Sequence, residues 1–165
     1  FGETATWAAT LGQVLRDRGF TVAYCPSGPL RQKVRFINSV PDCELALEFH
    51  FNAAPGGRGQ GSETLYCPGS GTGKGIATAI QTHLQQVCRP GRGVKAGWYR
   101  MDRPGVVDYE GDIDGDERPD YFLRSTRASA VIVEPEFVHN SERISQVRRD
   151  AVEAIADGIA EVIDP

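Results

Sequence analysis

Apolar residues recur at helical spacing in several stretches of the chain, and these stretches have recognisable boundaries. Trp7, Leu11 and Leu15 lie about one turn apart, and Gly19 follows them. This pattern predicts a helix over residues 3–18, because glycine favours the end of a helix. The same reasoning predicts three further helices. One begins near Ser27-Gly28-Pro29, another runs through residues 76–87, and the last starts at a capping Ser141.

Short runs of β-branched, aromatic and other apolar residues separate these helices. They predict strands at about residues 20–24, 44–51, 62–67 and 130–133, and residues 93–100 also look extended. Because strands alternate with helices, we expect an α/β fold. It would be a single domain over residues 1–165, with a mixed, mostly parallel twisted sheet flanked by helices on both faces.

Length and composition fit one domain and disfavour two other classes of protein. A chain of 165 residues suggests one domain, and 40% hydrophobic residues are enough for a core. A net charge of −4 argues against a general nucleic-acid binder, which normally has a basic face. Because no apolar run approaches the roughly 20 residues that span a bilayer, we expect no membrane insertion.

The four cysteines are Cys25, Cys43, Cys67 and Cys88. They form no C-x-x-C pair, which disfavours a structural zinc cluster. The first three fall in or near predicted strands, where free cysteine often packs as a small hydrophobic residue. The sequence leaves a disulfide bond open.

Two loops share features with ligand-binding motifs without fitting them. Residues 69–75 are rich in glycine and lie between a predicted strand and a predicted helix. Gly75 follows Lys74 where a phosphate-binding loop needs Ser or Thr, so a flexible entry loop is favoured. Residues 112–120 hold several aspartates, as calcium loops do, but Glu117 stands where such a loop needs glycine. A solvated loop is therefore favoured over a calcium site.

Three ionisable residues stand at the ends of predicted elements. His50 lies at the end of a strand, Glu134 follows the last strand, and Glu3 lies in the first turn of a helix. Ligands of open α/β folds bind at the carboxyl ends of strands, so these residues are candidates for a site. Simpler interpretations stay open: His50 bonds a loop carbonyl, and Glu3 interacts with the helix dipole. His83 is expected to pack on the apolar side of its helix.

A hydrolytic zinc site uses these residue types. It takes about three protein ligands from His, Glu or Asp and keeps one position open for water. Zinc lowers the pKa of that water to about 7 and polarises the scissile carbonyl. A nearby carboxylate that does not bind the metal takes a proton from this water and passes it to the leaving amine. Glu3 and His50 suit the ligand role, and Glu134 suits the role of base.

Four segments occur in an order that is typical of one enzyme family. The helix opened by Glu3 precedes a strand that ends in His50-Phe51-Asn52-Ala53. A Gly-x-Glu-x-x-Tyr strand with Glu63 follows. The last matching segment consists of residues 121–126 and then 130–140, which contain the motif Val-Glu-x-x-Phe-x-x-Asn. Nearly the whole chain therefore resembles the zinc-dependent N-acetylmuramoyl-L-alanine amidases of bacterial autolysins and phage endolysins.

This resemblance implies a site and a reaction. Glu3 and His50 would bind Zn²⁺, Glu134 would be the catalytic carboxylate, and Asn52 and Glu63 would shape the site or hold substrate. The fold would be phosphorylase/hydrolase-like, similar to zinc exopeptidases. The reaction would cleave the amide between N-acetylmuramic acid and L-alanine in peptidoglycan. We expect a monomer without a nucleic-acid partner that acts in the cell wall, in the periplasm or after secretion, or as a phage lysin.

Two features depart from the family pattern. The family begins with a strand ending in Gly-His-Gly, which supplies another zinc histidine, whereas this sequence begins at Phe1. We expect that first strand to be missing from the sequence, which would expose a sheet edge. Glu136 follows Glu134 where the family usually has Gly. It would either raise the pKa of Glu134 through like charge or face solvent.

Two alternative functions stay open. The absent histidine suits a metal-free relative that binds peptidoglycan without catalysis. A zinc carboxypeptidase of related fold would use the same residue types.

Overall fold

The computed structural model describes residues 2–54, 56–97 and 121–165. Residues 112–120, with the acidic loop, lie outside these ranges. Within the described residues the elements follow in the order α1 (Gly2–Asp17), α2 (Leu30–Ser39), β1 (Leu45–Phe49), β2 (Ser62–Tyr66), α3 (Gly71–Val87), β3 (Gly91–Ala96), α4 (Tyr121–Ser125), β4 (Ser129–Glu134) and α5 (Ser141–Ala160).

The described strands form one mixed sheet in the order β1-β4-β2-β3. β1 runs parallel to β4, and β2 runs parallel to β3, while the central pair of β2 and β4 is antiparallel. Two of the three pairings are therefore parallel, which confirms the mixed, mostly parallel sheet.

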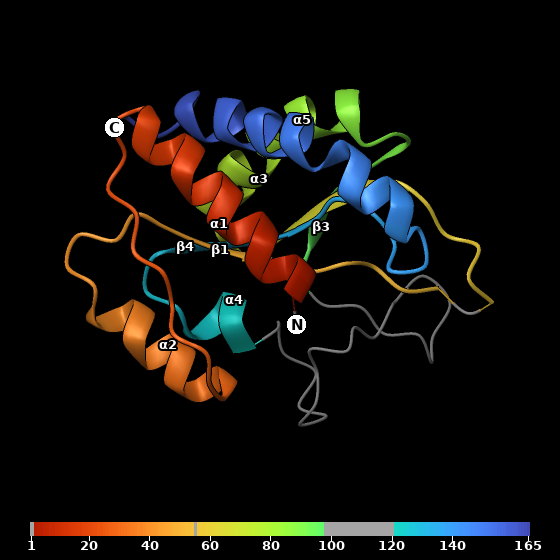
Figure 1. Cartoon of the computed structure of the whole chain (residues 1–165). Coiled ribbons are helices and arrows are strands. Elements are labelled where there is room, and N and C mark those ends of the chain that lie inside the picture. The colour runs from red at the N-terminus through yellow and green to blue at the C-terminus, as the bar shows by residue number, and fades with distance from the viewer. Residues whose placement is uncertain (1, 55, 98–120) are drawn as a thin grey trace.

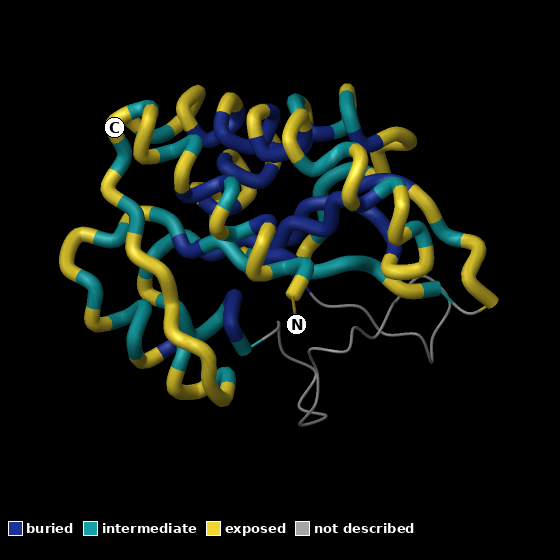
Figure 2. The backbone as a smooth tube through the Cα atoms, viewed as in Figure 1, coloured by how far each residue is buried: buried dark blue, intermediate teal, exposed yellow. Residues whose placement is uncertain are grey.

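Helices cover both faces of the sheet (Figure 1). α1, α3 and α5 lie on one side, and α2 and α4 lie on the other. The strand β4 explains this arrangement, because successive side chains point to opposite faces. Val131 and Val133 pack into the core under α1, α3 and α5, whereas Ala130 and Ile132 pack toward α2 and α4. The two central strands, β2 and β4, are accordingly the most buried strands of the sheet (Figure 2).

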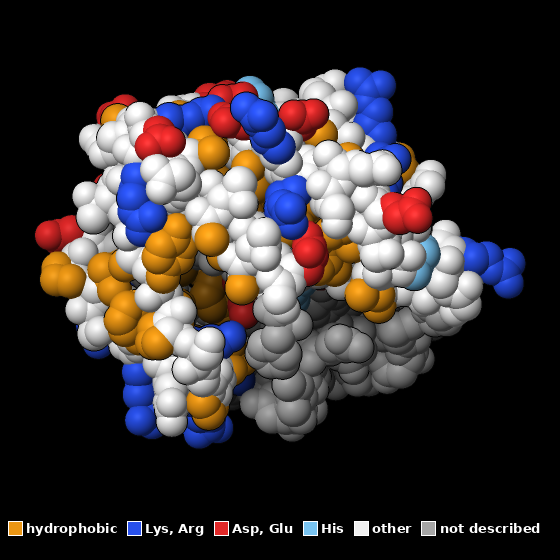
Figure 3. All heavy atoms as spheres, viewed as in Figure 1, with side chains coloured by type: hydrophobic (Ala, Val, Ile, Leu, Met, Phe, Trp, Pro, Cys, Tyr) orange, Lys and Arg blue, Asp and Glu red, His pale blue; other side chains and the backbone are white. Residues whose placement is uncertain are grey.

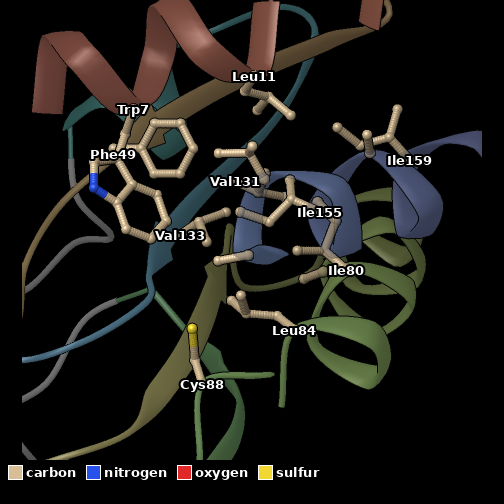
Figure 4. Close-up of a cluster of buried hydrophobic side chains, with 14 of the residues drawn as sticks. Trp7, Leu11, Phe49, Ile80, Leu84, Cys88, Val131, Val133, Ile155 and Ile159 are labelled. Atoms are coloured by element: carbon tan, nitrogen blue, oxygen red, sulfur yellow. The ribbon is translucent and has the colours of Figure 1, made fainter. Parts of the chain in front are cut away.

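The larger core joins α1 to the sheet through aromatic side chains. Trp7 is fully buried, and its ring lies edge-on to Phe49 at a centroid distance of 5.6 Å. Ile155 and Leu84 extend the same cluster between α5 and α3 (Figure 4). The helical spacing of the apolar positions in α1 is thus the spacing of its contacts with the sheet.

Two helices start at other residues than predicted. α3 begins at Gly71, so the prediction of a flexible entry loop is wrong for residues 71–75, which are helical. Ser70 caps α3, because its hydroxyl accepts a hydrogen bond from the Gly73 amide at 3.0 Å. The last helix was predicted to be capped by Ser141, but Ser141 is already helical and Asn140 is the N-cap residue. The Asn140 side chain does not cap the helix, because it donates to Gly59 O and to Glu136 Oε1 instead.

One predicted strand assignment is wrong. Residues 20–24 adopt no regular structure, because no described strand lies beside them and β-propensity needs a pairing partner. Tyr24 lies against α1 instead, where the guanidinium of Arg16 stacks 4.6 Å from the centre of its ring. Residues 121–125, for which the pattern predicted no element, form the short helix α4.

Histidine and cysteine side chains also differ from expectation. His83 is not packed in the core, since its Nε2 lies 2.9 Å from Glu161 Oε2 at the surface. All four cysteines are free thiols, so the open question of a disulfide is settled against one. Cys88 alone is fully buried, and burial raises the pKa of its thiol to about 12.

Among the described helices, none has the length and apolar character to cross a membrane.

The close approach of α3 and α5 depends on Gly158. A Cβ atom at this position would lie 2.6 Å from Ile80 Cα and 2.8 Å from the Ala79 carbonyl carbon. Because the obstacle is backbone, we expect Gly158→Ala to lower the free energy of unfolding by about 1–3 kcal/mol. Gly75→Ala is the control, since a Cβ there meets nothing within 4 Å. It should raise stability by up to about 1 kcal/mol through helix propensity. Urea denaturation measures both, and equal effects would contradict the packing argument.

Candidate metal and catalytic site

The predicted site residues His50 and Glu134 leave the sheet at the same end. They directly follow Phe49 and Val133, which are paired in the parallel register of β1 and β4. The His50 amide donates to Val133 O at 3.1 Å, so the segments that follow β1 and β4 remain side by side. The contact continues at Asn52, whose amide donates to Glu136 O at 2.9 Å.

Glu63 lies beside Glu134 on the antiparallel neighbour strand, in direct register. Its carboxylate is only 2% exposed and is fully hydrogen-bonded. Asn52 Nδ2 donates to Oε1 at 2.7 Å, Arg92 Nε donates to Oε2 at 2.8 Å, and Lys95 Nζ also contacts Oε2. Burial alone would raise the pKa of Glu63, but the hydrogen bonds and charges of Lys95 and Arg92 outweigh it and lower the pKa.

Glu134 is in the opposite situation. Its side chain is fully buried, and neither carboxylate oxygen has a hydrogen-bond partner among the described residues. Burial raises the pKa of Glu134 to about 9, and the negative charge of Glu63 adds to the shift. Two neighbouring carboxyl groups whose environments separate their pKa values are the pattern of an acid/base site.

Glu136 belongs to a different, structural cluster. It is fully buried, so the predicted possibility that it faces solvent is wrong. Its Oε1 accepts from the amides of Gly61 and Phe137, each at 2.9 Å, and its Oε2 forms an ion pair with Arg143 Nε at 2.6 Å. The raised pKa of Glu134 comes instead from burial and from Glu63.

His50 keeps its ring at the surface of this end of the sheet. Its side chain is 35% exposed, and Nε2 lies 3.6 Å from Glu48 Oε2. The simpler interpretation, in which the ring bonds a loop carbonyl, has no support among the described contacts. The imidazole is therefore accessible to a ligand.

Glu3 lies at the start of α1, as predicted. Its Oε1 accepts from Trp7 Nε1 at 3.2 Å and from Arg148 Nη1 at 2.7 Å. The Trp7 ring in turn packs against both Phe49 and Phe51, which flank His50. The first turn of α1 is thereby connected to the end of β1.

The donor set fits zinc in kind but is incomplete in number. Imidazole nitrogen and carboxylate oxygen are typical zinc ligands, and Glu3 and His50 supply one of each. No cluster of three or more His, Cys, Asp or Glu side chains suited to a metal occurs in the described ranges. A catalytic zinc would need at least one further ligand beyond these two.

The sequence did not identify Arg92 and Lys95 as site residues. In a regular strand, positions 92 and 95 would point to opposite faces. The pairing of β2 with β3 contains an irregularity, since a step of two positions in β2, from Ser62 to Thr64, is matched by a step of three positions in β3, from Gly91 to Val94. Gly93 in that stretch has a φ of +85°. The extra residue brings both cations to Glu63, which alternation alone cannot predict.

Several solved structures have the same fold. Cwp6 from Clostridium difficile matches with 22% identity and a TM-score of 0.76 over 98% of this chain, which spans only 25% of that protein. The catalytic domain of the endolysin CD27L, which targets Clostridia difficile, matches with 25% identity and a TM-score of 0.69 over 95% of this chain and 81% of that one. The amidase Ami1 from Mycobacterium smegmatis matches with 16% identity and a TM-score of 0.74 over 97% of this chain and 74% of that one.

No curated protein matches the chain by sequence. Residues 2–165 match the protein family described as N-acetylmuramoyl-L-alanine amidase. Amidases of this family act on the cell wall and are generally metal-dependent. The match confirms the fold class and the enzyme class that the sequence predicts, and the chain belongs to the N-acetylmuramoyl-L-alanine amidase family.

Proposed function

We propose that this domain is a zinc hydrolase that cleaves the amide bond between N-acetylmuramic acid and L-alanine in peptidoglycan. The observation that carries the proposal is Glu134, a buried carboxyl group without a hydrogen-bond partner among the described residues. It lies beside Glu63 and at the same sheet end as His50. The domain would act as a monomer in the cell wall, in the periplasm or outside the cell.

Glu3 and His50 would hold the zinc, together with a histidine on a strand that precedes Phe1. The position of β1 supports such a strand, because β1 is at the edge of the described sheet and residues 20–24 have no strand beside them. Bound zinc would supply an activated water and polarise the scissile carbonyl. The chain's own residues would provide the proton transfers.

Glu134 would carry the proton. Its carboxylate would accept a proton from the attacking water and then donate it to the leaving amine nitrogen of L-alanine. The raised pKa of Glu134 favours the protonated form that must act as the donor. A cation nearby favours the ionised form, so the metal-bound site would make both forms accessible.

Glu63 and Asn52 would shape the site instead of holding substrate. Glu63 is almost completely buried, and its oxygens are occupied by Asn52, Arg92 and Lys95. Its fixed negative charge would keep Glu134 a weak acid. Asn52 would join this pair to the loop after β1.

The alternatives predict different products. A metal-free peptidoglycan binder releases nothing, and a zinc carboxypeptidase shortens the stem peptide at its carboxyl end. The amidase leaves intact glycan and a new amino-terminal L-alanine. Mass spectrometry of digested muropeptides separates all three.

Replacement of Glu134 by glutamine tests its role in catalysis. We expect Glu134→Gln to lower the rate of cell-wall lysis by about 100-fold or more, the range of general acid–base catalysis. Zinc content should be unchanged, because Glu134 is not a proposed ligand. Glu142→Gln is the control, since Glu142 is an exposed residue of α5. Lysis by Glu134→Gln at the wild-type rate would disprove the assigned role.

The stability of the metal-free protein should depend on the protonation of Glu134. The folded state holds a proton with a pKa of about 9, against an ordinary value of 4.5, so rising pH between these values favours unfolding. Glu134→Gln removes this titration. We therefore expect the difference in free energy of unfolding, variant minus wild type, to be larger at about pH 8 than at about pH 5. Urea denaturation at the two pH values measures it. A difference that does not change with pH would contradict the raised pKa.

Removal of His50 tests the metal. The wild type should contain one equivalent of zinc, and a chelator should abolish lysis until zinc is restored. We expect His50→Ala to lose zinc and lysis together. His139→Ala is the control, because His139 is exposed and has no proposed metal role. Metal analysis decides: full zinc occupancy in His50→Ala would exclude His50 as a ligand.

A further inference from the structure

The two contacts of the Glu3 carboxylate fall on the same oxygen. Trp7 Nε1 and Arg148 Nη1 both donate to Oε1, at 3.2 Å and 2.7 Å. Within the described part of the chain, Oε2 has no hydrogen-bond partner. One face of the carboxylate is thus held by the protein, and the other is available.

We infer that Arg148 and Trp7 are positioning residues that orient Glu3 so that Oε2 is presented to the metal. This inference rests on the proposed function, in which Glu3 is a zinc ligand. Groups that hydrogen-bond to metal ligands fix ligand orientation, and their loss typically weakens metal binding about 10- to 100-fold.

Trp7 is suited to this role because it cannot move independently of the sheet. Its side chain is fully buried, and its ring contacts Phe49 at 5.6 Å and Phe51 at 5.8 Å between centroids. These two residues flank His50 in the sequence. Figure 4 shows the indole of Trp7 beside Phe49. The indole therefore links Glu3 to the strand end that carries the other proposed ligand.

Arg148 reaches Glu3 from α5, which packs along α1. Just beyond the far end of α1, Arg18 forms ion pairs with Glu153 and Asp157 of α5, both at 2.8 Å. Acidic and basic side chains accordingly lie close together over α1 and α5 (Figure 3). Contacts at both ends fix α1 against α5, and with it the backbone of Glu3.

Stability alone gives a weak reason for the pair of Arg148 and Glu3. The two side chains are 29% and 41% exposed, and ion pairs this open contribute about 0–1 kcal/mol. Glu3 is also favoured in the first helical turn without a partner. A simple surface ion pair does not require Arg148 and Trp7 to donate to the same oxygen of Glu3. An orienting role accounts for this arrangement, because it leaves Oε2 available.

A competing effect has the opposite sign. The positive charge of Arg148 repels a divalent cation, so its removal would tighten zinc binding if repulsion dominated. Orientation predicts weaker binding. The direction of the change in zinc affinity therefore separates the two effects.

Chelator competition on purified protein provides the measurement. We expect Arg148→Met to weaken zinc binding about 10- to 100-fold, and Arg148→Lys to restore part of the loss by donating to Oε1. Arg149→Met is the matched control, because Arg149 is the exposed neighbour on the same helix. It should bind zinc like the wild type. The unfolding temperatures of the metal-free Arg148 variants should stay close to that of the wild type, which would show that weaker zinc binding is not a consequence of lost folding stability.

Trp7→Phe provides a second test without a change of charge. It keeps an aromatic ring against Phe49 but removes the Nε1 donor, and it should also weaken zinc binding. Zinc binding by Arg148→Met that equals or exceeds that of the wild type would overturn the inference while leaving the proposed function intact. A wild type that binds no zinc would overturn both.

Discussion

Two buried carboxyl groups on neighbouring strands constrain the polar end of this sheet. Glu63 and Glu134 lie in register on β2 and β4, and burial leaves both almost without solvent. Two adjacent negative charges without water are unfavourable, so only one of the groups can be ionised easily. The hydrogen bonds of Asn52, Arg92 and Lys95 select Glu63 as the ionised one. The chemistry available to Glu134 follows from that selection.

The same constraint explains how much packing surrounds the site. A carboxyl group with no partner is costly to bury, and the cost must be offset elsewhere in the fold. β4 offsets it, because residues 130–133 are buried on both faces between two layers of helices. The strand that holds Glu134 is therefore the strand that contributes most to the core. Rigid packing up to its last residue also fixes where the carboxyl group lies.

Local patterns predicted most of the fold, and contacts between distant segments account for the rest. Helical periodicity located α1, and the compact run of residues 130–133 located β4, because those signals lie within a few residues of one another. Residues 20–24 have the composition of a strand, but a strand requires a partner that the described sheet does not provide. Arg148 contacts Glu3 across 145 positions of sequence, and no local pattern reports such a contact.

The candidate site was predicted from motifs, but the roles of its acids could be separated only by their contacts. Glu134 and Glu136 are both fully buried and only two residues apart. Glu136 receives hydrogen bonds from Gly61, Phe137 and Asn140 and pairs with Arg143, so its charge is compensated. It joins the connection between β4 and α5 to the loop before β2. Glu134 has no such partners among the described residues, so its carboxyl group is available for the proposed proton transfers. Glu136, an acid that the family pattern does not have, therefore stabilises the loops around Glu134 without taking over the role proposed for Glu134.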